Sequence, residues 1–161
     1  MKKSAYRDLT GKICVITGGA GVLGSSMARG LASAGVIPVL LDIREDVARE
    51  AAEEIRDEHG GQAFGFGADV LDKNSLEAVK KEIDARVGTV DLLLNAAGGN
   101  APQATTQVEQ IAEEDLEHLE RSFFGLEPEG FQKVFDLNFK GTLLPTLVYT
   151  RDMVQRQQGW S

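Results

Sequence analysis

The feature that most constrains this chain is a glycine-rich turn directly after a short apolar run. Residues 17–24 read Thr-Gly-Gly-Ala-Gly-Val-Leu-Gly and follow the buried-strand pattern at 13–16. Gly19, Gly21 and Gly24 fit the spacing Gly-x-Gly-x-x-Gly, whose glycines permit a tight turn, backbone approach to phosphate and close helix–strand packing. A helix that begins here directs unpaired N–H groups at an anion. The turn therefore predicts a binding site for a dinucleotide.

Composition limits the class of protein. A chain of 161 residues can form one domain with a core, and its net charge of −8 disfavours nucleic acid and anionic membranes as partners. The sequence has no apolar run that could span a bilayer, and its basic N-terminus lacks the apolar segment of a secretory signal. Cys14 is the single cysteine and cannot form an internal disulfide. We expect one domain over residues 1–161, in the cytoplasm.

Strand and helix patterns alternate in the first part of the chain. Apolar strand patterns lie at residues 12–17, 36–42, 63–67 and 90–94. Amphipathic helix patterns lie between them, at residues 22–34, 46–59 and 72–87. Pro38 lies in the second strand pattern, so we expect hydrogen bonding there to begin near Val39. Such repeats predict an α/β fold, a doubly wound parallel sheet with helices on both faces. The expected strand order is 3-2-1-4.

The pattern changes after the fourth strand. Residues 95–128 are rich in glycine, threonine and acidic side chains. The acidic tract at 109–120 indicates a solvated helix or loop rather than a pair of catalytic carboxylates. Residues 131–157 predict one long helix with apolar residues four apart, and Pro145 should kink it or end a segment.

Candidate binding residues follow each predicted strand. Asp42 ends the second strand and is followed by Ile43 and Arg44. An acidic residue at the position of Asp42 can accept hydrogen bonds from ribose hydroxyls. A carboxylate there favours NAD over NADP, whereas Arg44 could accommodate a 2′-phosphate. Asp69 and Val70 follow the third strand, and the fourth is followed by Asn95, Ala96, Ala97 and Gly98. Ligands bind at the carboxyl ends of strands in open α/β sheets, so these residues form one predicted site.

These pieces, in this order, resemble the short-chain dehydrogenase/reductase family over nearly the whole chain. Asn138, within residues 134–142, completes the set. The resemblance implies an NAD(P)-dependent oxidoreductase that transfers hydride between nicotinamide and a carbonyl or secondary alcohol, active as a homo-oligomer (dimer or tetramer). It implies that Asp69 meets the adenine and that Asn138 holds a water in a proton relay. The expected cofactor contacts are Thr17, Gly18, Gly19, Gly21, Val22, Leu23, Gly24, Asp42, Ile43, Arg44, Asp69, Val70, Asn95, Ala96, Ala97 and Gly98.

Two details refine the resemblance. Val22 stands where the family usually has its middle glycine, so we expect a slightly different turn rather than no site. The run from Gly98 to Pro102, residues 104–106 and an enlarged segment before Asn138 resemble the branch that includes D-mannonate oxidoreductases. This likeness implies a sugar-acid or polyol substrate. The threonines within 104–106 could equally be ordinary loop hydroxyls.

The acid–base residues of the family are not found in this sequence. The family uses a tyrosine followed by a lysine at +4, but Tyr6 is followed by Thr10 and Tyr149 by Met153. The sequence stops at Ser161, where the family begins its fifth strand and later supplies a catalytic serine. We therefore expect a truncated Rossmann-type domain with negligible activity alone. The alternatives are a non-catalytic dinucleotide-binding module and an assembly subunit that uses an exposed helix.

Truncation predicts exposed apolar surface. The fourth strand would be a bare edge of the sheet, and the helix at 131–157 would expose an apolar face. Other chemistries are disfavoured because His59 and His118 lack partners at metal-ligand spacing, so we expect no metal site. The sequence also lacks the Gly-x-x-x-x-Gly-Lys-Ser/Thr pattern of P-loop proteins.

Overall fold

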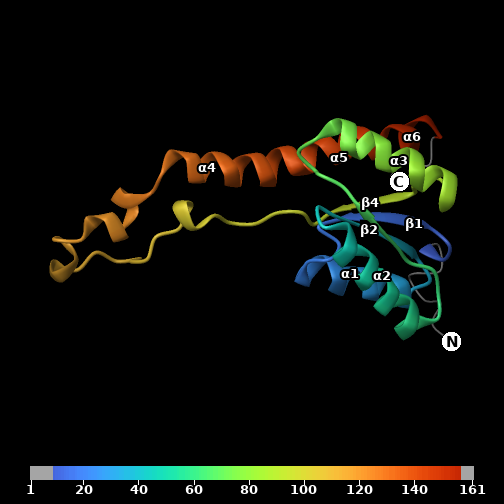
Figure 1. Cartoon of the computed structure of the whole chain (residues 1–161), viewed down its shortest axis with the longest axis horizontal. Coiled ribbons are helices and arrows are strands. Elements are labelled where there is room, and N and C mark those ends of the chain that lie inside the picture. The colour runs from blue at the N-terminus through green and yellow to red at the C-terminus, as the bar shows by residue number, and fades with distance from the viewer. Residues whose placement is uncertain (1–8, 157–161) are drawn as a thin grey trace.

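A four-stranded parallel sheet forms the centre of the molecule in the computed structural model, which describes residues 9–156 (Figure 1). The strands are β1 (Ile13–Thr17), β2 (Ile37–Asp42), β3 (Phe64–Gly67) and β4 (Leu92–Asn95). Their order is β3-β2-β1-β4, and each neighbouring pair is parallel. The predicted strand order is confirmed, with β4 at an edge of the described sheet.

Helices cover both faces of this sheet, which confirms the doubly wound α/β prediction (Figure 1). On one face lie α1 (Val22–Ser33) and α2 (Glu45–His59). The other face carries α3 (Lys73–Arg86), α5 (Gly141–Tyr149) and α6 (Arg151–Gln155). No helix within residues 9–156 is long and apolar enough to cross a membrane.

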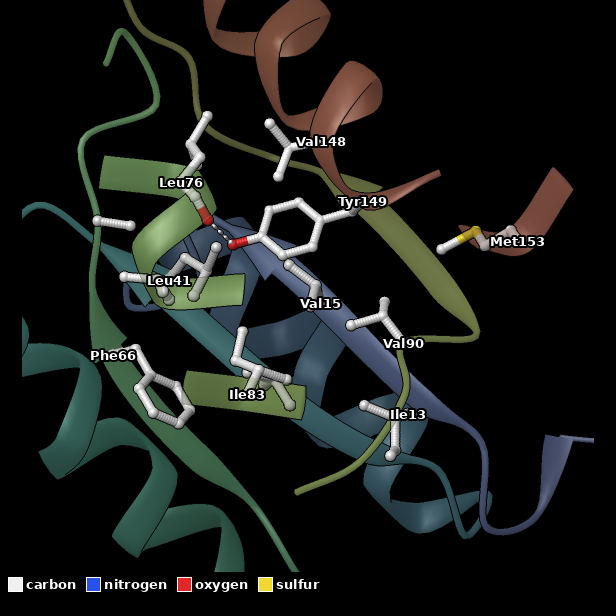
Figure 2. Close-up of a cluster of buried hydrophobic side chains, with 13 residues drawn as sticks. Ile13, Val15, Leu41, Phe66, Leu76, Ile83, Val90, Val148, Tyr149 and Met153 are labelled. Carbon is white, nitrogen blue, oxygen red and sulfur yellow. Dashed lines mark hydrogen bonds between the residues drawn. The ribbon is translucent and has the colours of Figure 1, made fainter. Parts of the chain in front are cut away.

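Successive side chains of β1 point to opposite faces of the sheet and so belong to two separate apolar clusters of the core. Val15 faces the α3–α5 side, where it packs in one cluster with Leu76 and Tyr149 (Figure 2). Ile16, the next residue, faces the opposite side and packs in the cluster that contains Ile55 of α2. Full burial of one such side chain contributes about 1.5–3 kcal/mol. Two buried faces explain why the strands read as continuous apolar runs.

Helix ends follow the signals in the sequence. Gly60 has φ +65° and ends α2, a conformation that glycine adopts without a Cβ penalty. The carboxylate of Asp72 accepts the N–H of Asn74 and so caps α3. Gly65 of β3 allows α2 to approach closely, because a Cβ there would overlap the backbone of Ala48. The predicted boundaries are correct to within about two residues.

The prediction for Pro38 is wrong in its starting point. The N–H of Ile37 already donates to the carbonyl of Lys12 at 2.8 Å, so β2 pairs with β1 before Val39. Successive N–H groups of a strand point to opposite sides, so the nitrogen of Pro38 faces β3. The β3 ladder begins only at the Val39–Phe64 pair. The missing N–H therefore breaks no bond of the ladder.

The predicted single helix at 131–157 is also wrong in detail. The structure has α4 (Pro128–Phe135), a π-helical segment η6 (Asp136–Lys140), then α5 and α6. Pro145 lies inside α5 and does not end it. A π segment immediately before α5 shifts the register of the backbone bonds, and such segments recur at functional sites.

Residues 100–135 form an arm that extends away from the sheet (Figure 1). Backbone hydrogen bonds join the segment that leaves the sheet to the segment that returns to it. They run from the Glu127 N–H to the Gln103 carbonyl and from the Gln107 N–H to the Arg121 carbonyl. The acidic tract within it forms exposed 3-10 turns, which agrees with the prediction of a solvated segment.

Candidate functional site

The turn after β1 is shaped by three glycines that have no room for a side chain. A Cβ on Gly18 would lie 2.8 Å from Ala97 Cα, and one on Gly19 would lie 2.7 Å from Leu40 Cβ. A Cβ on Gly24 would overlap the carbonyl oxygen of Gly18. Gly18 also has φ +60°, which disfavours other residues. Close packing of α1 against the turn explains Gly24, whereas Gly18 and Gly19 are restricted to glycine by Ala97 after β4 and by Leu40 of β2.

The N-terminus of α1 opens at this turn without a side-chain cap. Gly21 is the N-cap residue, and its N–H donates to the carbonyl of Gly18 at 3.0 Å. The next residues, Val22 and Leu23, are 85% and 69% exposed. The first N–H groups of a helix have no intrahelical acceptor and carry partial positive charge. This end of α1 can therefore receive a phosphate group, as the sequence predicts.

Thr17 joins the turn after β4 to the end of β1. Its side chain is fully buried, and Oγ1 accepts the N–H groups of Ala96 and Ala97, both at 3.1 Å. These bonds place Ala97 beside Gly18. Thr17, Ala96 and Ala97 were expected to contact a cofactor, and the geometry gives Thr17 a supporting position beneath the turn.

Asp42 lies at the carboxyl end of β2 with a largely buried carboxylate. Its Oδ1 accepts the N–H of Arg44 at 3.2 Å, and Arg44 Nε is 4.0 Å from the same oxygen. The Arg44 side chain is 68% exposed, and Ile43 projects into solvent between them. A second carboxylate oxygen remains available to accept hydrogen bonds from a ligand.

Asp69 and Val70 occupy the corresponding position after β3. Asp69 Oδ1 accepts the N–H of Leu71 at 2.8 Å, while its own N–H donates to Ser75 Oγ at 3.1 Å. These bonds hold the turn that leads into α3. Val70 is buried, and a Cβ on Gly141 at the start of α5 would lie 3.1 Å from Val70 Cγ2.

Asn95 ends β4 and leaves one polar atom without a partner. Its Nδ2 donates to Thr146 Oγ1 of α5 at 3.1 Å. Its Oδ1 is buried and accepts no hydrogen bond within residues 9–156. A buried acceptor without a partner carries a desolvation cost, and an ordered water could satisfy it.

Asn138 fastens the turn after β4 to the π segment η6. Its Nδ2 donates to the carbonyls of Gly99 and Val134, both at 2.8 Å, and its Oδ1 accepts the Gly99 N–H at 3.3 Å. The backbone carbonyl of Asn138 accepts the hydroxyl of Thr142. The side-chain amide of Asn138 thus positions the loop that begins at Gly98, and we call these bonds the Asn138 clamp.

Replacing Asn138 with alanine is expected to lower the free energy of unfolding by about 1 kcal/mol, because the backbone N–H and carbonyl of Gly99 both lose their hydrogen bonds to the Asn138 side chain. Urea denaturation of the purified chain measures the loss. Asn100→Ala is the matched control, since Asn100 bonds only within its own loop, to Thr105 and Ala101. Equal stabilities of the two variants would contradict the clamp.

A cavity of about 390 Å³ connects the carboxyl ends of the four strands. Several predicted residues line it together, namely Gly18, Asp42, Ile43, Asp69, Val70, Ala97 and Gly98. The structure adds four residues that the sequence did not indicate, namely Leu41, Ala68, Leu71 and Leu137. The remaining predicted residues lie around the cavity without lining it.

The added residues share an apolar character that carries no chemical signature. Leu137 had the only usable signal, because it directly precedes Asn138. A larger apolar groove of about 970 Å³ runs beside β4 and α1, but none of the predicted site residues lines it. Among residues 9–156, no cluster of three or more His, Cys, Asp or Glu side chains is arranged to hold a metal ion.

Comparison with known protein families agrees with this geometry. The family model described as short chain dehydrogenase matches residues 12–160. The chain belongs to the short-chain dehydrogenase family. Its glycine turn, the acidic end of β2 and the Asn138 clamp therefore occupy a fold shared with oxidoreductases of this family.

Two curated members of the family are similar over almost the whole chain. An uncharacterised oxidoreductase of Haemophilus influenzae is 40% identical over 157 residues, which is 98% of this chain and 54% of the relative. An uncharacterised oxidoreductase of Bacillus subtilis is 41% identical over 93% of this chain and 52% of its own length. The chain thus spans about half the length of the curated relatives it matches.

Solved structures of family members superpose well. A candidate D-mannonate oxidoreductase from Haemophilus influenza, with bound NAD, aligns with TM-score 0.83 and 41% identity, over 90% of this chain and 51% of that protein. A gluconate 5-dehydrogenase from Burkholderia cenocepacia, in complex with NADP and tartrate, aligns with TM-score 0.71 and 31% identity, over 94% and 51%. Both nicotinamide dinucleotides therefore occur among family members with this fold.

Proposed function

We propose that this chain forms the NAD(H)-binding part of an oxidoreductase that moves hydride between nicotinamide and a carbonyl or secondary alcohol. The cavity that joins the turns after all four strands carries the proposal, because Asp42 and Asp69 lie in its wall. Its volume of about 390 Å³ falls within the range of small-molecule sites. The NAD-bound relative supports the choice of ligand.

Each element of the site has a task in this proposal. The first N–H groups of α1 bind the pyrophosphate, and the glycines at 18, 19 and 24 let it approach the backbone. Asp42, Asp69 and Val70 line the cavity. Asp42 would accept hydrogen bonds from the ribose hydroxyls, and Asp69 and Val70 would hold the adenine. Gly98, held by the Asn138 clamp, would border the nicotinamide end. When bound, the nicotinamide supplies or accepts the hydride.

We extend the proposal to a sugar-acid or polyol substrate. The D-mannonate description of one relative and the polar loop after Gly98 support it. In this loop, Asn100 Nδ2 donates to Thr105 Oγ1 at 2.7 Å. Asn138 would hold a water of a proton relay beside the loop. The finer expectations of a cytoplasmic homo-oligomer remain part of the proposal.

A non-catalytic dinucleotide-binding module is the second candidate. The observation that favours it is the environment of Tyr149, which is fully buried against α3, while Tyr6 lies outside the described residues. Neither tyrosine is followed by a lysine at +4. Both candidates predict that the isolated chain binds NADH without turnover. Hydride transfer to or from a sugar acid by this chain would contradict the second candidate.

Replacing Asp42 with serine is expected to weaken NADH binding about 10-fold or more, because a charge-assisted hydrogen bond to the ribose is lost. NADPH should bind better than before, since the repulsion of the 2′-phosphate is removed and Arg44 is nearby. Titration of NADH and NADPH fluorescence measures both effects.

Asp46→Ser is the matched control for this prediction. Asp46 lies in the first turn of α2, is exposed and does not line the cavity, yet its replacement removes the same charge. We expect NADH affinity to be unchanged in this control. Equal affinities of the Asp42 variant and the parent chain would contradict the assigned role, and no NADH binding by the folded parent chain would contradict the proposed function.

A further inference from the structure

The end of the arm farthest from the sheet carries exposed apolar side chains (Figure 1). We define residues 109–127 as the tip. Four large apolar side chains of the tip have exposed fractions between 44% and 70%, namely Ile111, Leu116, Phe123 and Phe124. The rings of Phe123 and Phe124 lie edge to face with centroids 6.0 Å apart, and with Leu126 they line one side of a hollow of about 640 Å³ beside α4. The tip therefore offers an apolar surface with a recess in it.

The turn that carries the two phenylalanines is fixed by hydrogen bonds and close packing. Ser122 is 2% exposed, and its hydroxyl donates to the Leu119 carbonyl at 2.7 Å and accepts the N–H of Phe124 at 3.4 Å. Gly125 admits no side chain, because a Cβ there would overlap the carbonyl oxygen of Glu120. A packed turn that presents aromatic rings to solvent is typical of an interaction surface.

The negative charge of the chain is concentrated on the arm. Residues 100–135 contain eight Asp and Glu side chains against two Lys and Arg, a net charge of −6 in a chain whose total is −8. Glu113, Glu114 and Glu117 of the tip are exposed and form no ion pair within residues 9–156. These carboxylates therefore surround the apolar side chains with uncompensated negative charge.

Charge and apolar surface together select the partner. Nucleic acids and anionic membranes would be repelled by the carboxylates, and two copies of the tip would repel each other. A small polycation would neutralise the carboxylates but leave the phenylalanine rings in water. A basic amphipathic helix satisfies both features, because its apolar side chains enter a groove while its lysines and arginines meet the acidic rim.

We propose that the tip of the arm docks a basic amphipathic segment of another protein. The apolar side chains of that segment pack on Phe123 and Phe124, and its cations face the carboxylates at 113–120. No residue of the nucleotide cavity takes part. The inference therefore does not rest on the proposed function.

Fluorescence anisotropy with a labelled model peptide tests the proposal. The probe is an amphipathic peptide of about 14 leucine and lysine residues, long enough to form a helix on binding, and the matched probe has glutamate in place of every lysine. The parent chain is expected to bind the lysine peptide and not the glutamate peptide. Binding should weaken about 10-fold or more between roughly 50 and 300 mM salt, because salt screens exposed charges. Failure to bind the lysine peptide, or equal binding of both peptides, would overturn the proposal.

Phe124→Ser tests the apolar part of the surface. The variant is expected to bind the lysine peptide about 10-fold more weakly, since aromatic anchors carry much of the energy of an interface. Val154→Ser is the control, because Val154 is a comparably exposed apolar residue on α6, and far-UV circular dichroism shows that both variants are folded. Unchanged binding by the Phe124 variant would overturn the proposal. A parent dimer that the Phe124 variant loses in sedimentation velocity would assign the tip to a second copy and overturn it as well.

A charge-matched pair of variants tests the acidic part. Glu113→Gln combined with Glu117→Gln is expected to weaken binding of the lysine peptide about 5-fold, because two carboxylates of the rim are lost. Glu50→Gln combined with Glu53→Gln removes the same charge from exposed positions on α2 and should leave binding unchanged. Equal weakening in both pairs would mean attraction to net charge alone and would contradict docking at the tip.

Discussion

Gly24→Ala is expected to lower the free energy of unfolding by about 2–3 kcal/mol and to abolish measurable NADH binding. A Cβ at this position would overlap the carbonyl oxygen of Gly18 and lie 2.9 Å from both the Gly18 carbonyl carbon and Gly19 Cα. All three atoms belong to the backbone, so no side chain can rotate away. The clash is relieved only if α1 moves off the turn, which displaces its N-terminal N–H groups.

Gly30→Ala is the matched control in the same helix. A Cβ there meets no atom within 4 Å, and Gly30 is exposed. Because alanine favours the helix over glycine, this variant should gain about 0.8–1.0 kcal/mol and bind NADH normally. Urea denaturation and NADH fluorescence give both quantities. If Gly24→Ala proves as stable as the parent chain, the packing explanation of the fingerprint is wrong.

The glycine fingerprint could be interpreted from sequence only in part. The spacing singled out Gly19, Gly21 and Gly24. In the structure the tight contacts are at Gly18, Gly19 and Gly24, while a Cβ on Gly21 would meet only the Gly18 carbonyl, at 3.2 Å. The close contact of Gly18 is with Ala97, which follows β4. A motif of eight consecutive residues cannot predict a contact with a residue so far away in the sequence.

Periodicity predicted the sheet because its physical cause is local. Strands buried on both faces must be apolar at every position, and helices on one face must repeat every three to four residues. The π segment η6 has no such signature. It depends on how α4 joins α5 while Asn138 reaches Gly99, a contact between residues 39 apart in sequence. The arm was likewise visible only as a break in the pattern.

The candidate site was predictable to the extent that it is made of strand ends. Parallel strands bring their carboxyl ends to one edge, so the residues after β1 to β4 had to converge. The exposed apolar stripe was also predicted, and Leu143 and Leu147 are 42% and 55% exposed. Leu71 and Leu137 were missed because an apolar cavity wall looks like core in sequence.

Tyr149→Ala is expected to lower the free energy of unfolding by about 3–5 kcal/mol, the usual cost of removing a buried aromatic ring. Tyr149 has no exposed surface and packs beside Val148 on the α3 side of the sheet (Figure 2). Its hydroxyl donates to the carbonyl of Leu76 at 3.3 Å. The ring therefore holds α5 against α3, and the variant should lose that helix–helix contact.

Tyr149→Phe separates packing from chemistry. The ring remains and one neutral hydrogen bond is lost, so the expected cost is about 1 kcal/mol. Desolvation, with a smaller contribution from Asp84, raises the pKa of the Tyr149 hydroxyl well above its ordinary value, which keeps it protonated at neutral pH. NADH binding should therefore equal that of the parent chain. A large loss of NADH binding in the phenylalanine variant, at nearly unchanged stability, would instead assign the hydroxyl to the site and contradict its role as a core contact.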